Sequence, residues 1–373
     1  MSNLKFETLS ILKLLLNIEG IGPHKIFSLL AQFHDFESII NARYESLIQV
    51  EGISSILGGK IHSSKNELKK IGGDLERELE MLQKLGGKLI TFWDEDYPEL
   101  LKKIYFPPVI LYTMGNSSPN DKYSVAVVGT RQPTSYGKNM AERFSAELTG
   151  KNITIVSGLA RGIDSTAHDS ALKAGGRTIA VIGSGLDVVY PPENRKLFQR
   201  IAEGGMIISE FELGTKPDAQ NFPRRNRIIS GISLGTLVIE TKINGGAMQT
   251  AAYALDQNRE IFAIPGNLNT LQGEGPNRLI QRGEAKLVTT TDDILVELQL
   301  KLKPEIGKNI PKPSVELNLF EEKLINILDY DPKQIDEIAT IASMSTSDCL
   351  VNLLTLEFKG LVKQLPGKMF TRC

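Results

Sequence analysis

The stretch SVAVVGTR, residues 124–131, joins a short β-branched run to a glycine, a threonine and an arginine. The same pattern recurs in ITIVSGLARG at 153–162, in TIAVIGSG at 178–185, and in TLVIE at 236–240 before a Gly245-Gly246 turn. Short apolar runs that stop at glycines are typical of buried parallel strands, whose ligands lie in a crevice at the carboxyl ends. We therefore predict an α/β fold built on a doubly wound, mostly parallel sheet.

The loops that follow these strands predict a site for phosphate. Glycine allows tight turns and close backbone approach, and the free N–H groups at helix N-termini attract anions. Helices are expected after the loops, near residues 136–149, 163–175, 193–204, 246–257 and 276–282. The open question is which molecule carries the phosphate.

The composition limits the class of protein. The 373 residues are 41% hydrophobic and 23% charged, as in an ordinary globular protein of two or three domains. The net charge of −1 implies that any basic site for nucleic acid is local. Cys349 and Cys373 are the only cysteines, which gives no disulfide framework and favours a reducing cytoplasm.

Metal, cofactor and membrane binding find no support in the sequence. The four histidines stand at positions 24, 34, 62 and 168, with no cysteine or histidine companion at metal-ligand spacing. No run approaches the ~18 apolar residues of a membrane span, and the N-terminus does not resemble a signal peptide. We expect no metal site, no cofactor and no membrane contact, and we expect His168 to be structural.

The N-terminal region, residues 1–85, is predicted to form a helical domain because its leucines and isoleucines recur at helical spacing. It contains a weak internal repeat, in which IEGI at 18–21 and VEGI at 50–53 each precede a helix. Two strands are then expected at 88–93 and 109–113, at the entrance to the α/β domain.

The other expected boundaries follow from composition. The α/β domain is predicted to span residues 86–300, and the proline- and lysine-rich residues 301–317 are typical of a linker. Residues 318–373 show three helical patterns and then a hairpin, which indicates a winged helix.

Each strand-end loop can be interpreted either as a binding site or as an ordinary structural turn. After the first strand, two consecutive main-chain donors and Arg131 could bind a phosphate, and a generic turn with a solvated arginine is the alternative. In the second loop Arg161 lies between two glycines, and Asp164 with Ser165 is expected to cap the next helix. The third loop, Gly183-Ser184-Gly185, begins like a dinucleotide fingerprint but lacks its third glycine, so the signal is weak.

The densest charge lies in FPRRNR at 222–227, where three arginines fall within four residues. Their mutual repulsion argues against a core role and leaves a solvated surface turn or an anion clamp with Phe222 as a stacking face. Single-stranded nucleic acid is held by such a basic groove with an aromatic platform, each stacked base contributing roughly 1–3 kcal/mol.

Glu240, at the end of a buried strand, is either a general base or a brace for these arginines, and we favour the brace. The loops contain no Ser-His-Asp, Cys-His or paired-carboxylate set, so we predict a binding protein and not an enzyme.

Seven separated motifs resemble the DNA-processing protein DprA family, also called Smf, and occur in the same order. They are AVVGTR at 126–131, SGLARGID at 157–164, IGSGLD at 182–187, FPRRNRIISG at 222–231, Glu240-Thr241 with its Gly-Gly turn, AIPG at 263–266 and GPNRLI at 275–280. The resemblance covers residues 97–295. It implies a Rossmann-like domain, with a helix-hairpin-helix or SAM-like helical domain before it and a small winged-helix-like domain after it.

The resemblance also implies a function. Members of the family bind single-stranded DNA, protect it during natural transformation and help to load the RecA recombinase, usually as homodimers through the Rossmann-like domain. The DNA-binding residues that it implies are Gly129, Thr130, Arg131, Gly158, Ala160, Arg161, Gly162, Gly183, Ser184, Gly185, Phe222, Arg224, Arg225, Asn226, Arg227, Gly245 and Gly246. Where many relatives place a lysine after Tyr190, this chain has Pro191-Pro192, with Arg195 and Lys196 a few residues further on.

Two other interpretations differ in kind. A nucleotide-acting enzyme, such as the phosphoribohydrolases with a similar core, would carry Pro-Gly-Gly-x-Gly-Thr followed by glutamate. Here Asn244 precedes the glycines and Met248 replaces the third. A nucleotide-regulated scaffold would make the arginine cluster incidental. The acidic C-terminal segment argues against a groove-reading helix there and favours a contact with protein.

Overall fold

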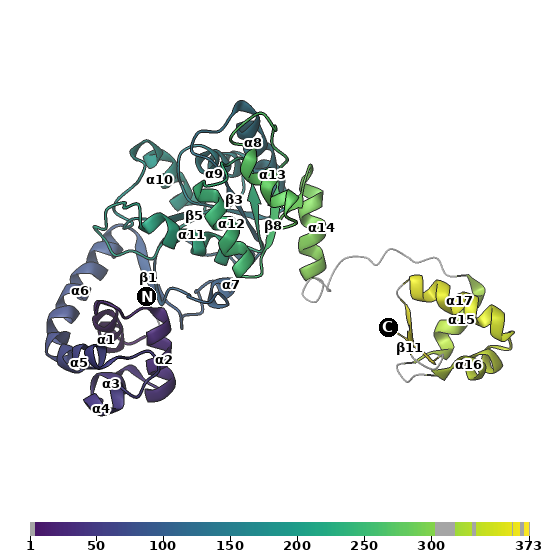
Figure 1. The fold of residues 1–373 in the computed structure, drawn as a ribbon, viewed down its shortest axis with the longest axis horizontal. Coiled ribbons are helices and arrows are strands. Elements are labelled where there is room, and N and C mark those ends of the chain that lie inside the picture. Colours follow the sequence, from purple (N-terminus) through teal and green to yellow (C-terminus); the bar gives the residue numbers. More distant parts are fainter. Residues whose placement is uncertain (1–3, 303–317, 330–332, 360, 366–368, 373) are drawn as a thin grey trace. The chain divides into compact units, whose positions relative to one another are not determined.

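The computed structural model describes residues 4–302, 318–329, 333–359, 361–365 and 369–372 (Figure 1). The chain divides into two compact units, Met1–Lys301 and Leu302–Cys373. Most of the expected linker, residues 303–317, lies outside the described residues. Because residues 1–85 and the sheet belong to one compact unit, the boundary at residue 85 stays a prediction.

The N-terminal region is helical, as its periodicity predicts. Its helices are α1 (Phe6–Leu16), α2 (Pro23–Phe33), α3 (Phe36–Ile40), α4 (Tyr44–Leu47), α5 (Ser55–Ser64), the short η1 (Lys65–Glu67) and α6 (Leu68–Lys84). They enclose a core in which Leu12, Leu15 and Ile26 are fully buried.

The internal repeat of the sequence is also a repeat of structure. Gly20 and Gly52 both adopt positive φ angles, of +92° and +81°, which favour glycine over other residues. Each lies inside the same closed turn, with Ile21 N donating to Ile18 O at 2.9 Å and Ile53 N donating to Val50 O at 3.0 Å. The two turns lead into α2 and α5, so the pattern in the sequence marks two equivalent helix starts.

A nine-stranded sheet forms the centre of the first unit, in the order β1-β2-β6-β5-β4-β3-β7-β8-β9. The strands are β1 (Gly87–Thr91), β2 (Ile110–Gly115), β3 (Ser124–Val128), β4 (Thr154–Ser157), β5 (Thr178–Ile182), β6 (Met206–Ser209), β7 (Gly235–Val238), β8 (Glu260–Ala263) and β9 (Lys286–Leu287). The pairs β1–β2 and β2–β6 are antiparallel, and all the others are parallel. The runs in the sequence identify β1 to β5 and β7 but miss β6, β8 and β9.

Helices cover both faces of this sheet, which is the doubly wound arrangement that was expected. They are α7 (Glu99–Lys102), α8 (Ser135–Gly150), α9 (Ile163–Lys173), α10 (Arg195–Gly204), α11 (Asn221–Gly231), α12 (Gly246–Asp256), α13 (Glu274–Gln281) and α14 (Thr291–Leu302). Side chains alternate along β3: Val125 and Val127 pack with α8, α9 and α14, whereas Ala126 and Val128 pack with α11 and α12. The order of the strands reverses between β3 and β7, which makes their carboxyl ends the switch point of the sheet.

A buried cation joins the N-terminal helices to the sheet. Lys13 on α1 is 6% exposed, and its Nζ donates to Glu78 Oε2 and to the Tyr112 hydroxyl, both at 2.8 Å. The same ammonium group donates to Glu212, in the loop after β6. One side chain of α1 therefore holds α6, strand β2 and a strand-end loop together.

The second unit has the three helices and the hairpin that its sequence predicts. Its elements are α15 (Leu319–Ile327), β10 (Lys333–Gln334), α16 (Ile335–Ala342), α17 (Thr346–Phe358), β11 (Val362–Leu365) and β12 (Met369–Arg372). Strand β12 lies between β10 and β11 in a small antiparallel sheet. Leu324, Ile338, Leu353 and Phe370 are fully buried between these elements, which form a winged helix. The turn of the hairpin, at residues 366–368, lies outside the described residues.

In the described part of the chain, none of the helices combines the length and the apolar character needed to cross a membrane.

Candidate nucleic-acid site at the strand ends

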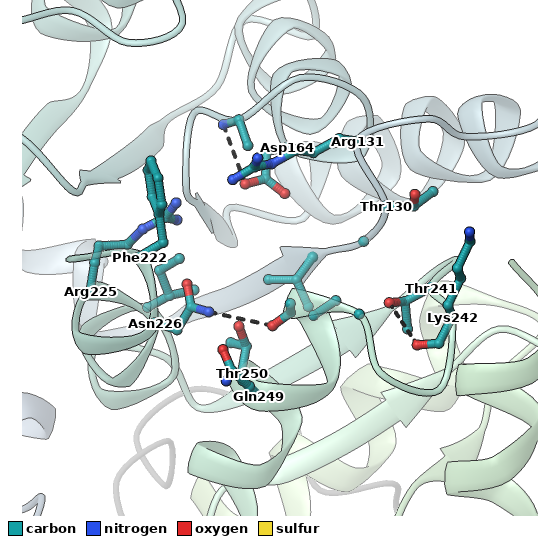
Figure 2. Close-up of a pocket in the computed structure, with 17 residues that line it drawn as sticks. Thr130, Arg131, Asp164, Phe222, Arg225, Asn226, Thr241, Lys242, Gln249 and Thr250 are labelled. Atoms are coloured by element: carbon teal, nitrogen blue, oxygen red, sulfur yellow. Dashed lines mark hydrogen bonds between the residues drawn. The ribbon is translucent and has the colours of Figure 1, made fainter. Parts of the chain in front are cut away.

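An open pocket of about 360 Å³ lies at the switch point between β3 and β7 (Figure 2). Four segments contribute its walls: the loop after β3, the start of α9 with the loop before it, helix α11, and the turn from β7 into α12. Its lining residues are Val128, Gly129, Thr130, Arg131, Ala160, Asp164, Phe222, Arg225, Asn226, Ile229, Thr241, Lys242, Gly245, Gly246, Ala247, Gln249 and Thr250.

A smaller hollow of about 30 Å³ continues this pocket along the strand ends. It shares Arg131, Ala160, Phe222 and Arg225 with the first. The residues that only the hollow contains are Gly158, Arg161, Gly183, Ser184, Tyr190 and Pro191. We call the two together the strand-end groove. Thirteen of the seventeen expected site residues line it, because the carboxyl ends of parallel strands meet at one edge.

Two guanidinium groups share one aromatic ring in this groove. The Cζ atoms of Arg131 and Arg225 lie 5.2 Å and 5.9 Å from the centre of the Phe222 ring. Neither arginine forms an ion pair within 4 Å among the described residues. Burial, together with the charge of Arg131, lowers the pKa of Arg225 to about 10 even though Asp164 acts in the opposite direction. Because Arg225 Nε has no hydrogen-bond partner and the side chain is 5% exposed, the groove holds a buried cation with unused donors.

The second loop is shaped around Arg225. An ideal Cβ built on Gly158 would stand 1.4 Å from Arg225 Nη1, so only glycine leaves room for the guanidinium. Asp164 Oδ2 accepts hydrogen bonds from Gly158 N at 3.1 Å and Ala160 N at 3.4 Å, and burial raises the pKa of this carboxyl. The expected capping of α9 by Asp164 and Ser165 is therefore wrong. Gly162, with φ +76°, precedes the first helical residue, and Asp164 binds back to the loop.

The arginine cluster is neither a surface turn nor a single clamp, because residues 221–231 form helix α11. Successive helical residues point about 100° apart, so the three arginines diverge. Arg225 enters the groove, whereas Arg227 forms an ion pair with Glu210 in which both side chains are 13% exposed. Arg224 is exposed, lies 6.0 Å from the Phe211 ring centre, and lines a separate hollow.

The predicted brace between Glu240 and the arginines is also wrong. Glu240 is 2% exposed, and its carboxylate accepts hydrogen bonds from Thr134 N at 2.8 Å and Thr134 Oγ1 at 2.6 Å. Thr134 is the N-cap of α8, so Glu240 fixes the start of that helix. Gly137 accommodates the carboxylate, because a Cβ there would lie 2.2 Å from Glu240 Oε2. The carboxylate that does pair with an arginine of the cluster is Glu210.

The backbone donors after β3 differ from the expectation. Thr130 N donates to Glu240 O at 2.6 Å, so this N–H is already used within the fold and is not a phosphate ligand. The N-terminus of α12 is more accessible: the helix begins at Gly246, and no side chain caps it. Gly245 and Gly246 line the pocket, so the positive end of this helix faces it.

Several expected residues support the groove without lining it. Gly185 N donates to Thr215 O at 2.9 Å, and a Cβ at this position would lie 2.5 Å from Glu212 O. Gly183, which does line the hollow, faces the Phe222 ring, where a Cβ would lie 3.1 Å from Cδ1. Gly185 and Gly162 therefore serve the backbone, as tight turns require.

Arg161 is an exposed cation of the groove, as Arg131 and Lys242 are. Its side chain is 59% exposed and forms an ion pair with Glu193, which raises the pKa of the guanidinium. Pro191 lines the hollow beside Arg161, in the turn after Tyr190 where the family resemblance would lead one to expect a lysine. Gln249 and Thr250 were not predicted as site residues, and their only signal in the sequence is that they follow the Gly245-Gly246 turn by one helical turn.

His168 is structural, as expected. It is fully buried, its Nδ1 lies 2.6 Å from Thr178 Oγ1, and burial with the nearby Arg225 charge lowers its pKa to about 3.

Together, the fold and the groove define a doubly wound α/β protein with a basic pocket at the switch point of its sheet. The family model described as DNA recombination-mediator protein A matches residues 88–299, and the DprA winged helix domain matches residues 311–368. The chain belongs to the DprA (Smf) family of DNA recombination mediators.

Individual relatives agree with this assignment. Protein Smf of Synechocystis is 35% identical over 95% of this chain and 96% of its own length, and DNA processing protein DprA of Bacillus subtilis is 41% identical over 64% of this chain and 80% of its own. The structure of DprA from Streptococcus pneumoniae has a TM-score of 0.67 at 34% identity, covering 80% of this chain and 99% of that one. A structure of DNA processing protein A from Helicobacter pylori, described by its single-stranded DNA binding mode, has a TM-score of 0.52 at 30% identity and covers 58% and 96%.

Proposed function

We propose that this chain binds single-stranded DNA in the strand-end groove and acts, without catalysing a reaction, as a recombination mediator. The observation that carries the proposal is the pair of guanidinium groups on the Phe222 ring, with no ion pair to either within the described residues. Such a pair favours a dianionic or polyanionic ligand, and the N-terminus of α12 adds a third source of positive potential.

Phosphate contacts alone do not separate DNA from free nucleotides, so the shape of the site matters. The groove extends past the first pocket into the hollow at Gly183 and Tyr190, which supports a ligand longer than one nucleotide. Phe222 and Tyr190 have ring centres 5.9 Å apart and supply faces on which unpaired bases can stack. Bases in a duplex are already stacked on each other, so this combination favours a single strand.

The Helicobacter pylori protein supports the same ligand, since its structure is described by its mode of binding single-stranded DNA. We further propose from the family resemblance that the chain protects incoming DNA in natural transformation, helps to load RecA, forms homodimers through the Rossmann-like domain, and works in the cytoplasm. All the expected DNA-binding residues and the expected segments 1–85, 86–300, 301–317 and 318–373 are part of this proposal. The exceptions are the Thr130 N–H, which is used within the fold, and the arginines of α11 other than Arg225, which do not line the groove.

The test is fluorescence anisotropy with labelled single- and double-stranded oligonucleotides over a series of salt concentrations. The Arg131→Ala variant is compared with the wild type and with Arg77→Ala, a control in which the lost arginine is 74% exposed on α6. We expect the wild type to prefer the single strand. Arg131→Ala should weaken binding to all sequences and make the log–log salt slope shallower by about 0.7.

Two results would contradict the proposal. Equal affinity of the wild type and Arg131→Ala at every salt concentration would remove the groove as the binding site. Tight binding of nucleoside monophosphates with no affinity for oligonucleotides would replace DNA by a nucleotide as the ligand.

A further inference from the structure

Three aromatic side chains gather on the surface outside the strand-end groove. Tyr105 is 79% exposed and Phe106 is 46% exposed, and their rings meet edge to face with centres 4.3 Å apart. His24, at the start of α2, has its ring centre 6.5 Å from Tyr105 and 6.3 Å from Phe106. We call these three residues the aromatic patch. Adjacent exposed aromatic residues are unusual on a protein that has no partner for them.

The segment that presents these rings is held firmly. Ile104, directly before them, is 6% exposed and packs above Gly231 at the end of α11. After them, Pro107 and Pro108 are buried, and Pro108 O accepts a hydrogen bond from the Tyr97 hydroxyl at 2.6 Å. The rings are therefore exposed by a fixed backbone on both sides, which limits the entropy lost when a ligand stacks on them.

A cation of α11 lines a hollow beside the segment that leads into His24. Arg224 lines a hollow of about 190 Å³ together with Gly22 and Pro23, the residues directly before His24. Two carboxylates also line this hollow: Glu210 is paired with Arg227, and Glu212 shares the Lys13 ammonium group with Glu78, so that trio keeps one negative charge.

Arg224 forms no ion pair among the described residues, so its charge remains available. Lys103 is exposed and stands two residues before Tyr105 in the sequence. Arg224 is also the neighbour of Arg225 on α11, so one helix presents a cation to each site.

We infer that the aromatic patch is a second contact for single-stranded nucleic acid, continuous with the groove through Arg224. Bases stack on Tyr105 and Phe106, and phosphates lie against Arg224 and Lys103. The inference rests on the proposed function, because it extends the path of the same strand beyond the groove. Cations beside exposed rings are the combination that holds single strands without regard to sequence.

The experiment measures affinity against strand length with the full chain. Oligothymidylates from about 4 to about 16 nucleotides and longer are titrated against the wild type, the double variant Tyr105→Ala/Phe106→Ala, and Arg131→Ala. The control is Phe6→Ala, which removes a ring that is also 46% exposed. The double variant should bind the shortest strands like the wild type and bind long strands about tenfold or more weakly, whereas Arg131→Ala is weakened at every length.

A second readout locates the contact directly. Strands that contain 5-iodouracil should cross-link to the peptide with Tyr105 and Phe106 in the wild type when the strand is long. Equal affinity of the double variant and the wild type at all lengths, without this cross-link, would overturn the inference while Arg131→Ala still supports the proposed function. A change in the oligomeric state of the DNA-free double variant, with unchanged DNA affinity, would make the patch a protein contact and overturn it too. If the wild type binds no strand of any length, the proposed function itself fails.

Discussion

Gly158 offers a way to disturb the strand-end groove without removing any charge. In Gly158→Ala, the new Cβ would lie 1.4 Å from Arg225 Nη1 and 2.4 Å from Cζ, distances that no contact tolerates. The φ angle of Gly158 is not in the left-handed region, so alanine does not strain the backbone. The flexible end of the arginine must move, and the guanidinium leaves its place beside Phe222.

The size of the effect follows from the lost contact. A hydrogen bond from a charged group contributes about 1.5–3 kcal/mol, which corresponds to about a tenfold to about a 150-fold loss of affinity. If Arg225 contacts one phosphate, the log–log salt slope should become shallower by about 0.7. Anisotropy with single-stranded oligonucleotides measures both quantities. Chemical unfolding of the variant checks that it remains folded.

Two further variants test whether the position of the Arg225 guanidinium group decides DNA affinity. Gly73→Ala, in helix α6, adds a Cβ that meets no atom within 4 Å, and it should leave DNA affinity unchanged. Arg225→Gln removes the charge without adding volume and should reproduce the loss seen in Gly158→Ala. If Gly158→Ala binds DNA as tightly as the wild type, or if Arg225→Gln does, then Arg225 does not hold the strand.

Two other predictions concern stability. Arg227→Met leaves Glu210 without its partner in a site where both side chains are 13% exposed, so it should lower the free energy of unfolding by about 3 kcal/mol. The same variant should keep its DNA affinity within about twofold of the wild type, because Arg227 lies outside the groove. Urea unfolding measures the loss of stability, and anisotropy measures the affinity. A variant that stays stable but loses much of its DNA affinity would contradict both expectations. His168 has a pKa of about 3 in the folded chain against an ordinary value of 6.5, so below pH 6.5 the unfolded chain binds a proton that the folded chain does not. The free energy of unfolding should therefore fall as the pH drops below 6.5, by up to about 1.4 kcal/mol per pH unit. The variant His168→Gln should flatten this slope, whereas the control His62→Gln, which replaces an exposed histidine, should not.

The sheet could be predicted from the sequence because its central strands are β-branched runs with glycines directly after them. Strand β6, MIIS at 206–209, is as long as β4 and β7, but Glu210 and Phe211 follow it in place of a glycine turn, so it lacks the pattern that identified the other strands. Helix α11 was missed because FPRRNR at 222–227 combines a proline with three arginines. The proline stands in the first turn, where its missing N–H costs nothing. Further along, Ile228 and Ile229 are buried and hold the segment helical.

The partners of charged groups were harder to predict than their positions. Glu240 binds Thr134, 106 residues earlier in the chain, and no local pattern reports such a pair. The three arginines looked equivalent in the sequence, and only the helical geometry gives them three different surroundings. Tertiary contacts decide which charge is neutralised, so sequence patterns locate a charged site better than they assign roles within it.

The Lys13 ion network has a consequence for how the protein can be divided. A fragment of residues 86–300 would contain the whole sheet, but it would lack Lys13 and Glu78. Tyr112 and Glu212 would then lose the ammonium group that now binds both. Glu212 belongs to the loop whose Thr215 carbonyl anchors Gly185. Truncation would thus loosen one wall of the groove, and weak DNA binding by such a fragment would report a damaged site, not a DNA contact made by the missing helices.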